Sequence, residues 1–259
     1  MSKDPAAQWD IYFRDSWAAL STTLGESQAY RFAASVGLLW VRPDAFAAGV
    51  AHVVLDAVVR AGFRPVAGVV VRLDRRGVRA LWAGELERAT VERLWLLDAV
   101  VALGPSVLLL LADDAPVLGS PVASRLRGVK GANDPQVREP GTLRAVAGSP
   151  NRALTMVHTA EDGADLVREL GVFCDWPQRC ALVAQAAGHL AAGTTWSVEP
   201  ALRTVQRQVP AMPHVPLAGR VTRHPSGLAA ADLADRWAKV RRASEVWPLL
   251  APPGHGCQP

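Results

Sequence analysis

Hydrophobic positions along the chain follow two periods, which predicts a mixture of strands and helices. Short apolar runs bounded by turn residues are typical of buried strands, and four such runs occur, at residues 35–41, 65–73, 106–112 and 153–158. Apolar residues recur at helical spacing over 47–62, in two stretches within 77–103, near 121–127 and over 161–173. An irregular loop rich in glycine and proline is expected over 128–141.

This order of elements predicts an α+β fold with a ferredoxin-like βαββαβ core and added helices. We expect an antiparallel sheet with helices on one face. An amphipathic helix is predicted within 4–31, and two more helices over 178–192 and 229–246. The chain is therefore expected to divide into three parts: an N-terminal helical extension (1–34), a central domain (35–175) and a C-terminal helical extension (176–259).

Composition is that of a folded chain with a mild positive charge. Half of the 259 residues are hydrophobic and 20% are charged, which excludes a disordered segment and supplies a sizeable core. The formal net charge is +4. Nearly all basic residues are arginines, since Lys3, Lys130 and Lys239 are the only lysines. So mild a charge permits an anionic ligand but does not predict a nucleic-acid surface.

Cysteine usage and hydropathy indicate the setting of the protein. Cys174, Cys180 and Cys257 cannot form a paired disulfide framework. The spacing of Cys174, Cys180 and His189 does not match that of a common zinc site. The sequence does not open with a signal peptide pattern and has no apolar run of membrane-spanning length. We expect a cytoplasmic protein without a membrane contact.

Residues suited to phosphoryl transfer gather around the last predicted strand. His158 ends that strand and Glu169 follows eleven residues later, three turns along the next helix. A carboxylate bonded to one imidazole nitrogen fixes the tautomer and leaves the other nitrogen as a nucleophile. Arg127 and Arg144 precede the strand, and arginine binds phosphate oxygens in fork geometry. A histidine nucleophile with arginine clamps indicates phosphoryl transfer.

Five separated pieces of sequence resemble the nucleoside diphosphate kinase family, in the family's order and on the expected elements. They are Val-Arg-Pro-Asp at 41–44, Arg127 with Gly-Ala-Asn-Asp-Pro at 131–135, Pro-Gly-Thr-Leu-Arg at 140–144, Thr-Met-Val-His-Thr-Ala-Glu at 155–161, and Arg-Glu-Leu at 168–170. The resemblance covers residues 35 to about 174, just over half of the chain.

The resemblance implies a known chemistry for the four residues singled out above. His158 matches the histidine that attacks the γ-phosphate of a nucleoside triphosphate, forms a phosphohistidine and passes the group to a diphosphate. Glu169 matches the carboxylate that orients this histidine. Arg127 and Arg144 match the arginines that bind the phosphates.

The resemblance also implies the cofactors and partners. ATP or another nucleoside triphosphate is expected as the ligand, with Mg²⁺ carried on its phosphates rather than in a metal site of the protein. Asp44 matches a structural acid, and the loop 128–141 matches one that lines the nucleotide site and often a subunit contact. Family members are commonly homo-oligomers, but the two extensions here could cap the surfaces they use.

Several positions that match nucleotide-contacting residues carry a different side chain. Arg42 stands for the family's lysine, Asn133 for threonine, Thr155 for asparagine, Trp82 for tyrosine, and Ala160 for serine. Arg42, Asn133, Thr155 and Trp82 are expected to bind the nucleotide or its phosphates. Arginine and lysine differ in shape and hydration at a phosphate site, and Ala160 removes a hydroxyl. These departures predict a specialised relative with altered base recognition.

Three functions are compatible with these residues. The first is a nucleotide-dependent phosphotransferase that works through a phosphohistidine at His158, with a nucleotide or another phosphate acceptor as the second substrate. The second is a repurposed nucleotide-dependent enzyme of a specialised biosynthetic pathway, in which the C-terminal helices shape a site for a second small-molecule substrate. The third is a non-catalytic nucleotide-binding protein, against which the retention of His158 and Glu169 counts. Fold alone does not decide among them.

Overall fold

The computed structural model describes residues 10–86, 89–115, 120–209, 235 and 238–242. Its strands are β1 (Gly37–Val41), β2 (Phe63–Val71), β3 (Ser106–Asp113) and β4 (Val157–Thr159). Its helices are α1 (Ile11–Leu24), α2 (Glu26–Ser35), α3 (Pro43–Ala47), α4 (Ala51–Arg60), α5 (Arg75–Leu81), α6 (Ala83–Leu86), α7 (Val91–Val101), α8 (Val122–Lys130), α9 (Leu143–Val146), α10 (Gly163–Phe173), α11 (Trp176–Ala192) and α12 (Glu199–Gln206), with a 3₁₀ turn at Pro135–Val137. The helix expected over 229–246 falls mostly outside the described residues; Asp235 and residues 238–242 are helical.

The four strands form one antiparallel sheet in the order β2-β3-β1-β4. This is the strand order of a ferredoxin-like βαββαβ core, so the predicted α+β class and sheet are confirmed. In the register, Trp40 of β1 lies opposite Leu108 of β3 and His158 of β4. The two central strands are buried throughout β1 and over nearly all of β3, which explains why they appear in the sequence as uninterrupted apolar runs.

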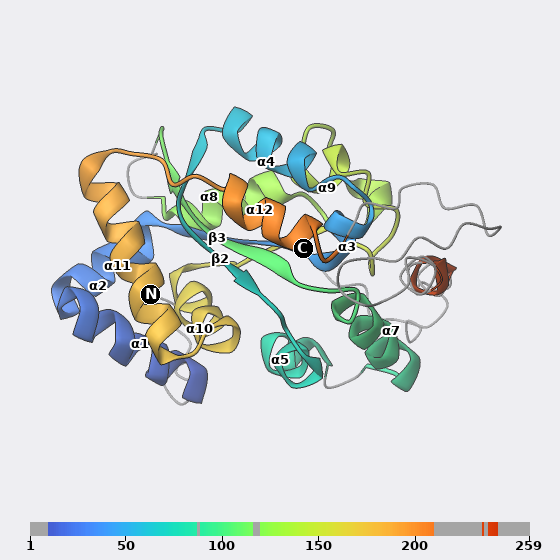
Figure 1. Ribbon diagram of the computed structural model, residues 1–259, viewed down its shortest axis with the longest axis horizontal. Helices are drawn as coiled ribbons and strands as arrows, with labels where there is room; N and C mark the ends of the chain where they lie inside the picture. The colour runs from blue at the N-terminus through green and yellow to red at the C-terminus, as the bar shows by residue number, and fades with distance from the viewer. Residues whose placement is uncertain (1–9, 87–88, 116–119, 210–234, 236–237, 243–259) are drawn as a thin grey trace.

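Helices cover both faces of the sheet, so the expectation of helices on one face is wrong. A Cβ on Gly37 would lie 2.8 Å from Leu126 Cδ2 of α8. Trp40, three residues along β1, points to the other face, where its ring lies 5.1 Å from that of Phe173 on α10. Figure 1 shows α4, α8 and α9 above the sheet and α1, α5 and α10 below it. The second layer combines the N-terminal helix α1 with α5 and α10, helices that a bare βαββαβ order does not contain.

The N-terminal region forms two helices rather than the single helix expected. Gly25 separates α1 from α2 with φ 80° and ψ 148°, a conformation that glycine adopts without steric cost. Asp10 caps α1 by accepting the N–H groups of Tyr12 and Phe13. Its other oxygen pairs with Arg168 Nε at 2.8 Å. Because α1 packs on α10 and α11, this region belongs to the layer that supports the second face of the sheet.

The segment after α11 covers the outer edge of β2. Trp196 N–H donates to the carbonyl of Pro65 at 2.8 Å, and Arg64 Nη1 donates to the carbonyl of Thr194 at 2.6 Å. Proline at position 65 is itself typical of an edge strand, since it has no N–H to donate. An uncovered edge is a template for pairing with another chain. The segment after α11 therefore supplies, within the same molecule, a hydrogen-bond donor to the β2 edge.

We expect Gly68→Ala to destabilise the protein because the Trp196 ring lies against Gly68. An added Cβ would lie 2.4 Å from a Trp196 ring atom and 2.7 Å from Leu109 Cδ2. Overpacking of this kind costs about 1–3 kcal/mol, which urea unfolding would measure. Gly188→Ala is the matched control, because nothing lies within 4 Å of its added Cβ. In a double-mutant cycle, Trp196→Ala should remove part of the Gly68→Ala penalty; strict additivity would contradict this packing.

Within the described ranges, no helix combines the length and apolar character required to cross a lipid bilayer.

Candidate active site

His158 and Glu169 meet between β4 and α10. His158 Nε2 lies 2.8 Å from Glu169 Oε1, and the two side chains are 12% and 7% exposed. Asp162 begins α10 by accepting the N–H groups of Ala164 and Asp165, which fixes the register that brings Glu169 to the ring. With Nε2 donating to the carboxylate, Nδ1 carries the lone pair. The arrangement therefore presents one imidazole nitrogen as a nucleophile.

His158 is the middle residue of β4, not the end of a longer strand as expected from 153–158. Residues 153–156 are held in a turn instead, because Asn151 Oδ1 accepts the N–H groups of Ala153 and Leu154. Met156 has φ 62°, the one positive φ of a non-glycine residue in the described part of the chain. This turn takes the backbone out of the sheet and shortens the strand.

Two tryptophans flank the histidine ring. The Trp82 ring meets the His158 ring edge-on with 5.7 Å between centroids, and the buried Trp40 ring does so at 6.4 Å. Trp40 is held by its own Nε1–H, which donates to Ser106 Oγ at 2.7 Å. Aromatic rings prefer such edge-to-face geometry. The indoles therefore restrict the imidazole orientation, and Trp82 lies directly beside His158.

Arg42 and Thr155, both expected to contact a nucleotide, are hydrogen-bonded to each other in the protein interior. Arg42 Nη1 donates to Thr155 Oγ1 at 2.6 Å, and its other two nitrogens donate to Asp44 Oδ1 and to the carbonyl of Ala153, both at 3.1 Å. Asp44 Oδ2 also accepts the N–H of Met156. Arg42 is only 3% exposed and Asp44 is fully buried. This network joins the end of β1 to the turn before β4.

Arg144 lies under the segment that carries His158. Its Nη1 donates to the carbonyl of Gly131 at 3.0 Å, and its Nη2 approaches the carbonyl of Val157 at 3.5 Å. Burial lowers the pKa of Arg144 to about 10, helped by the positive charges of Arg42 and Arg138. Within the described residues its Nε has no acceptor. This guanidinium would gain from an anionic ligand.

Arg127 is connected to the His158 segment through Glu161, which follows His158 by three residues. Its Nε pairs with Glu161, and Lys130 Nζ reaches the other oxygen of the same carboxylate at 2.7 Å. Lys130 is 7% exposed, and burial lowers its pKa. Burial would raise the pKa of Glu161, but Lys130 and Arg127 together hold it below its usual value. The sequence motifs do not single out Lys130. Its one signal in the sequence is that lysine is rare in a chain rich in arginine.

Asn133 lies in the loop that follows α8 and has an exposed side chain. This loop begins later than expected, because α8 continues to Lys130 and ends at Gly131, where φ is 85°. Arg138 then organises it by donating to the carbonyls of Ala132 (3.0 Å), Asn133 (3.0 Å) and Ser149 (2.6 Å). Arg138 also approaches the carbonyl of Arg144 at 3.5 Å, so it links the backbone of Asn133 to that of Arg144.

Asp165 on α10 gives the site a pH-dependent contribution to stability. Burial raises its pKa from 3.8 to about 6, with help from the negative charge of Glu169. The folded state therefore binds more protons than the unfolded state between these two values, and stability falls as the pH rises through this window. Asp165→Asn should stabilise the protein at pH 7.5 by about 1 kcal/mol after solvent screening. In urea unfolding the gain should fade toward pH 4; a gain independent of pH would contradict it.

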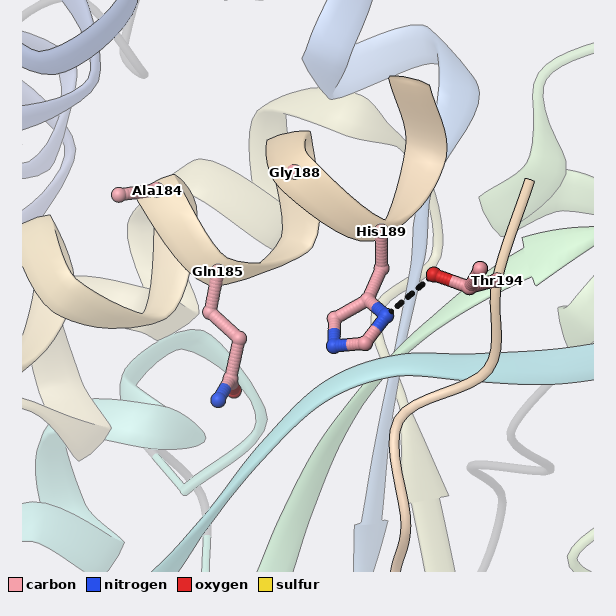
Figure 2. A pocket seen from close by; sticks show the side chains of 5 residues that line it. All are labelled: Ala184, Gln185, Gly188, His189 and Thr194. Atoms are coloured by element: carbon pink, nitrogen blue, oxygen red, sulfur yellow. Dashed lines mark hydrogen bonds between the residues drawn. The ribbon is translucent and has the colours of Figure 1, made fainter. Parts of the chain in front are cut away.

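The described part of the chain offers no cluster of three or more His, Cys, Asp or Glu side chains suited to a metal ion. A shallow hollow of about 250 Å³ lies elsewhere, between α11 and Thr194. Figure 2 shows Gln185 and His189 pointing from α11 into it, with His189 Nδ1 bonded to Thr194 Oγ1 at 2.8 Å. This hollow contains none of the residues expected to bind a nucleotide.

Comparison with known proteins identifies one family. Residues 36–176, more than half of the chain, match the family described as nucleoside diphosphate kinase. Among similar solved structures is a halophilic nucleoside diphosphate kinase from Halobacterium salinarum in complex with CDP, at 22% identity and a TM-score of 0.44, covering 55% of this chain and 89% of that one. The enzyme from Aquifex aeolicus has 22% identity and a TM-score of 0.44 over 53% and 93% of the two chains. The Borrelia burgdorferi enzyme, a transition state mimic with bound vanadate and ADP, has 17% identity and a TM-score of 0.43, covering 55% of this chain and 88% of that one.

Proposed function

The chain belongs to the nucleoside diphosphate kinase family, and from this premise we propose that it is a nucleotide-dependent phosphotransferase in which His158 carries the phosphoryl group. The observation that carries the proposal is the 2.8 Å contact between His158 Nε2 and Glu169 Oε1. It orients the ring and leaves Nδ1 to react, inside the segment that matches the family. The other clustered groups are then assigned by the charge they would meet.

In the proposed reaction the Nδ1 lone pair of His158 attacks the γ-phosphorus of a nucleoside triphosphate. The bond to the bridging oxygen breaks and a nucleoside diphosphate leaves. Glu169 stabilises the positive charge that develops on the imidazole. In the second half, an oxygen of an acceptor diphosphate attacks the phosphorus, the phosphorus–nitrogen bond breaks, and neutral His158 returns.

The positive side chains around His158 would bind the phosphate oxygens. Arg127 is half-exposed, so its guanidinium is accessible to a ligand. Arg144 would act from beneath, where a buried guanidinium interacts strongly with an anion. Mg²⁺ would be carried on the nucleotide, where it neutralises phosphate charge. Trp82 would close the side of the site next to the reacting ring, and Asn133 would contact the nucleotide from the loop.

One observation favours the repurposed enzyme as a second candidate. All three guanidinium nitrogens of Arg42 are bonded to protein atoms, although this position matches a phosphate-contacting lysine of the family. The Arg42 Cζ also lies 5.7 Å from the ring centroids of both Trp40 and Trp82. A cation held in this way has taken a structural task. In this candidate the same site would use the nucleotide for a different reaction, with a second small molecule as the other substrate.

The experiment is a pulse of γ-labelled ATP with Mg²⁺, followed by intact-mass analysis, a test of acid lability and a chase with a panel of nucleoside diphosphates. An acid-labile phosphoenzyme that diphosphates discharge supports the kinase reaction. A phosphoenzyme that no diphosphate discharges supports phosphoryl transfer from His158 to a different acceptor, whereas consumption of the triphosphate without a phosphoenzyme supports the second candidate. Nucleotide binding without any phosphoenzyme overturns the phosphohistidine mechanism. Repeating the pulse with EDTA tests whether Mg²⁺ is required.

A further inference from the structure

The carboxylate of Glu161 joins two cations beside the proposed nucleophile. One oxygen pairs with Arg127 Nε and the other lies 2.7 Å from Lys130 Nζ. Glu161 follows His158 by three residues. Arg127 and Lys130 come from the last turn of α8. The cluster therefore holds one anion between two cations, next to the ring that would receive a phosphoryl group.

The exposure of the three side chains shows which partner can leave. The side chains of Glu161 and Arg127 are 44% and 51% exposed, whereas that of Lys130 is 9% exposed. Ion pairs between exposed groups contribute little to stability, so Glu161 can leave Arg127 at small cost and turn to solvent once another anion pairs with Lys130. A buried lysine, in contrast, requires an anionic partner. Lys130 therefore needs a replacement anion whenever Glu161 moves away.

We propose that Lys130 is a further phosphate-binding residue of this site, and that Glu161 occupies the place of a phosphate on Lys130 and Arg127 until a nucleotide arrives. The inference rests on the proposed function, since it assigns residues to the same nucleotide site. Carboxylate and phosphate both offer paired oxygens to arginine and lysine. A polyphosphate brings more negative charge than one carboxylate, so it displaces Glu161 from both cations.

Glu161→Gln tests the first half of the proposal. Removing the competing charge should tighten the binding of ADP and of inorganic pyrophosphate by about fivefold, the weight of one half-exposed ion pair. Adenosine has no phosphate, so its affinity should not change. The matched control is Glu199→Gln on α12, whose exposed partner Arg203 lies four residues away; it should leave all three affinities unchanged. Isothermal titration calorimetry measures each of them.

Lys130→Met tests the second half with a side chain of similar length and no charge. We expect the affinities for ADP and pyrophosphate to fall by about tenfold through loss of a charge-assisted contact, again with no effect on adenosine. Lys130→Arg should restore most of the binding. Thermal unfolding of every variant separates a loss of binding from a loss of structure.

The outcomes distinguish this inference from the proposed function. Tighter binding of ADP by Glu161→Gln supports the inference even where no phosphoenzyme forms, in which case the kinase mechanism alone fails. A phosphoenzyme in the wild type combined with unchanged or weaker binding by Glu161→Gln overturns the inference and leaves the kinase mechanism intact. If neither the wild type nor Glu161→Gln binds ADP or pyrophosphate, the inference and the proposed function are both overturned.

Discussion

Replacing His158 with alanine is expected to abolish the phosphoenzyme and to reduce phosphoryl transfer by at least about 10⁴-fold, as removal of a nucleophile does in other enzymes. The expectation follows from the geometry of β4, where Nε2 is bonded to Glu169 Oε1 at 2.8 Å. Only Nδ1 is then left to form the bond to phosphorus. Intact-mass analysis after a pulse of γ-labelled ATP measures the phosphoenzyme directly.

Two further variants make this result decisive. Alanine leaves Glu169 without its partner in a buried setting, so the variant could lose structure as well as chemistry. His158→Gln keeps a donor for Glu169 but cannot hold a labile phosphate. His189→Gln is the matched control, because His189 lies on α11 and bonds Thr194 instead. Label retained by His158→Gln, or lost from His189→Gln, would contradict the assignment.

The sequence predicts the central strands well because their environment is uniform. β1 and β3 each lie between two strands and are buried along most of their length, so nearly every position is apolar and the signal is strong. The apolar pattern predicts β4 too long, because the segment before it is held both by Asn151 and by Asp44, which accepts the N–H of Met156 across 112 residues of sequence. A hydrophobic pattern does not contain such long-range bonds, so it cannot place the start of this strand.

The same distinction applies to the site. His158 and Glu169 belong to one strand–helix unit, so their spacing alone was enough to expect them together. The bond between Arg42 and Thr155 and the pair of cations on Glu161 join segments that the sequence shows only as separate motifs. Burial matters as well. Arg42 matches a ligand-contacting position of the family, but all three of its guanidinium nitrogens donate to protein oxygens.

Asp44→Ala is expected to be the most destabilising substitution in this region, at about 3–5 kcal/mol, because it leaves the buried Arg42 charge without its partner. The pair is 3.1 Å apart, with side-chain exposures of 4% for Arg42 and 0% for Asp44. The N–H of Met156 would lose its acceptor at the same time. For a chain of this length such a loss corresponds to a fall in Tm of about 10 °C, measurable by thermal unfolding or urea denaturation.

The controls for Asp44→Ala separate the effect of leaving a buried charge unpaired from the effect of removing an exposed aspartate. Asp114→Ala removes a pair with Arg64 in which the aspartate is 51% exposed, and it should cost no more than about 1 kcal/mol. Adding Arg42→Met to Asp44→Ala should recover part of the stability, because no unpaired charge then remains inside. Equal losses in the single and double variants would contradict this account. Since the network holds the turn that leads into β4, Asp44→Ala should also slow phosphoenzyme formation, whereas Asp114→Ala should not.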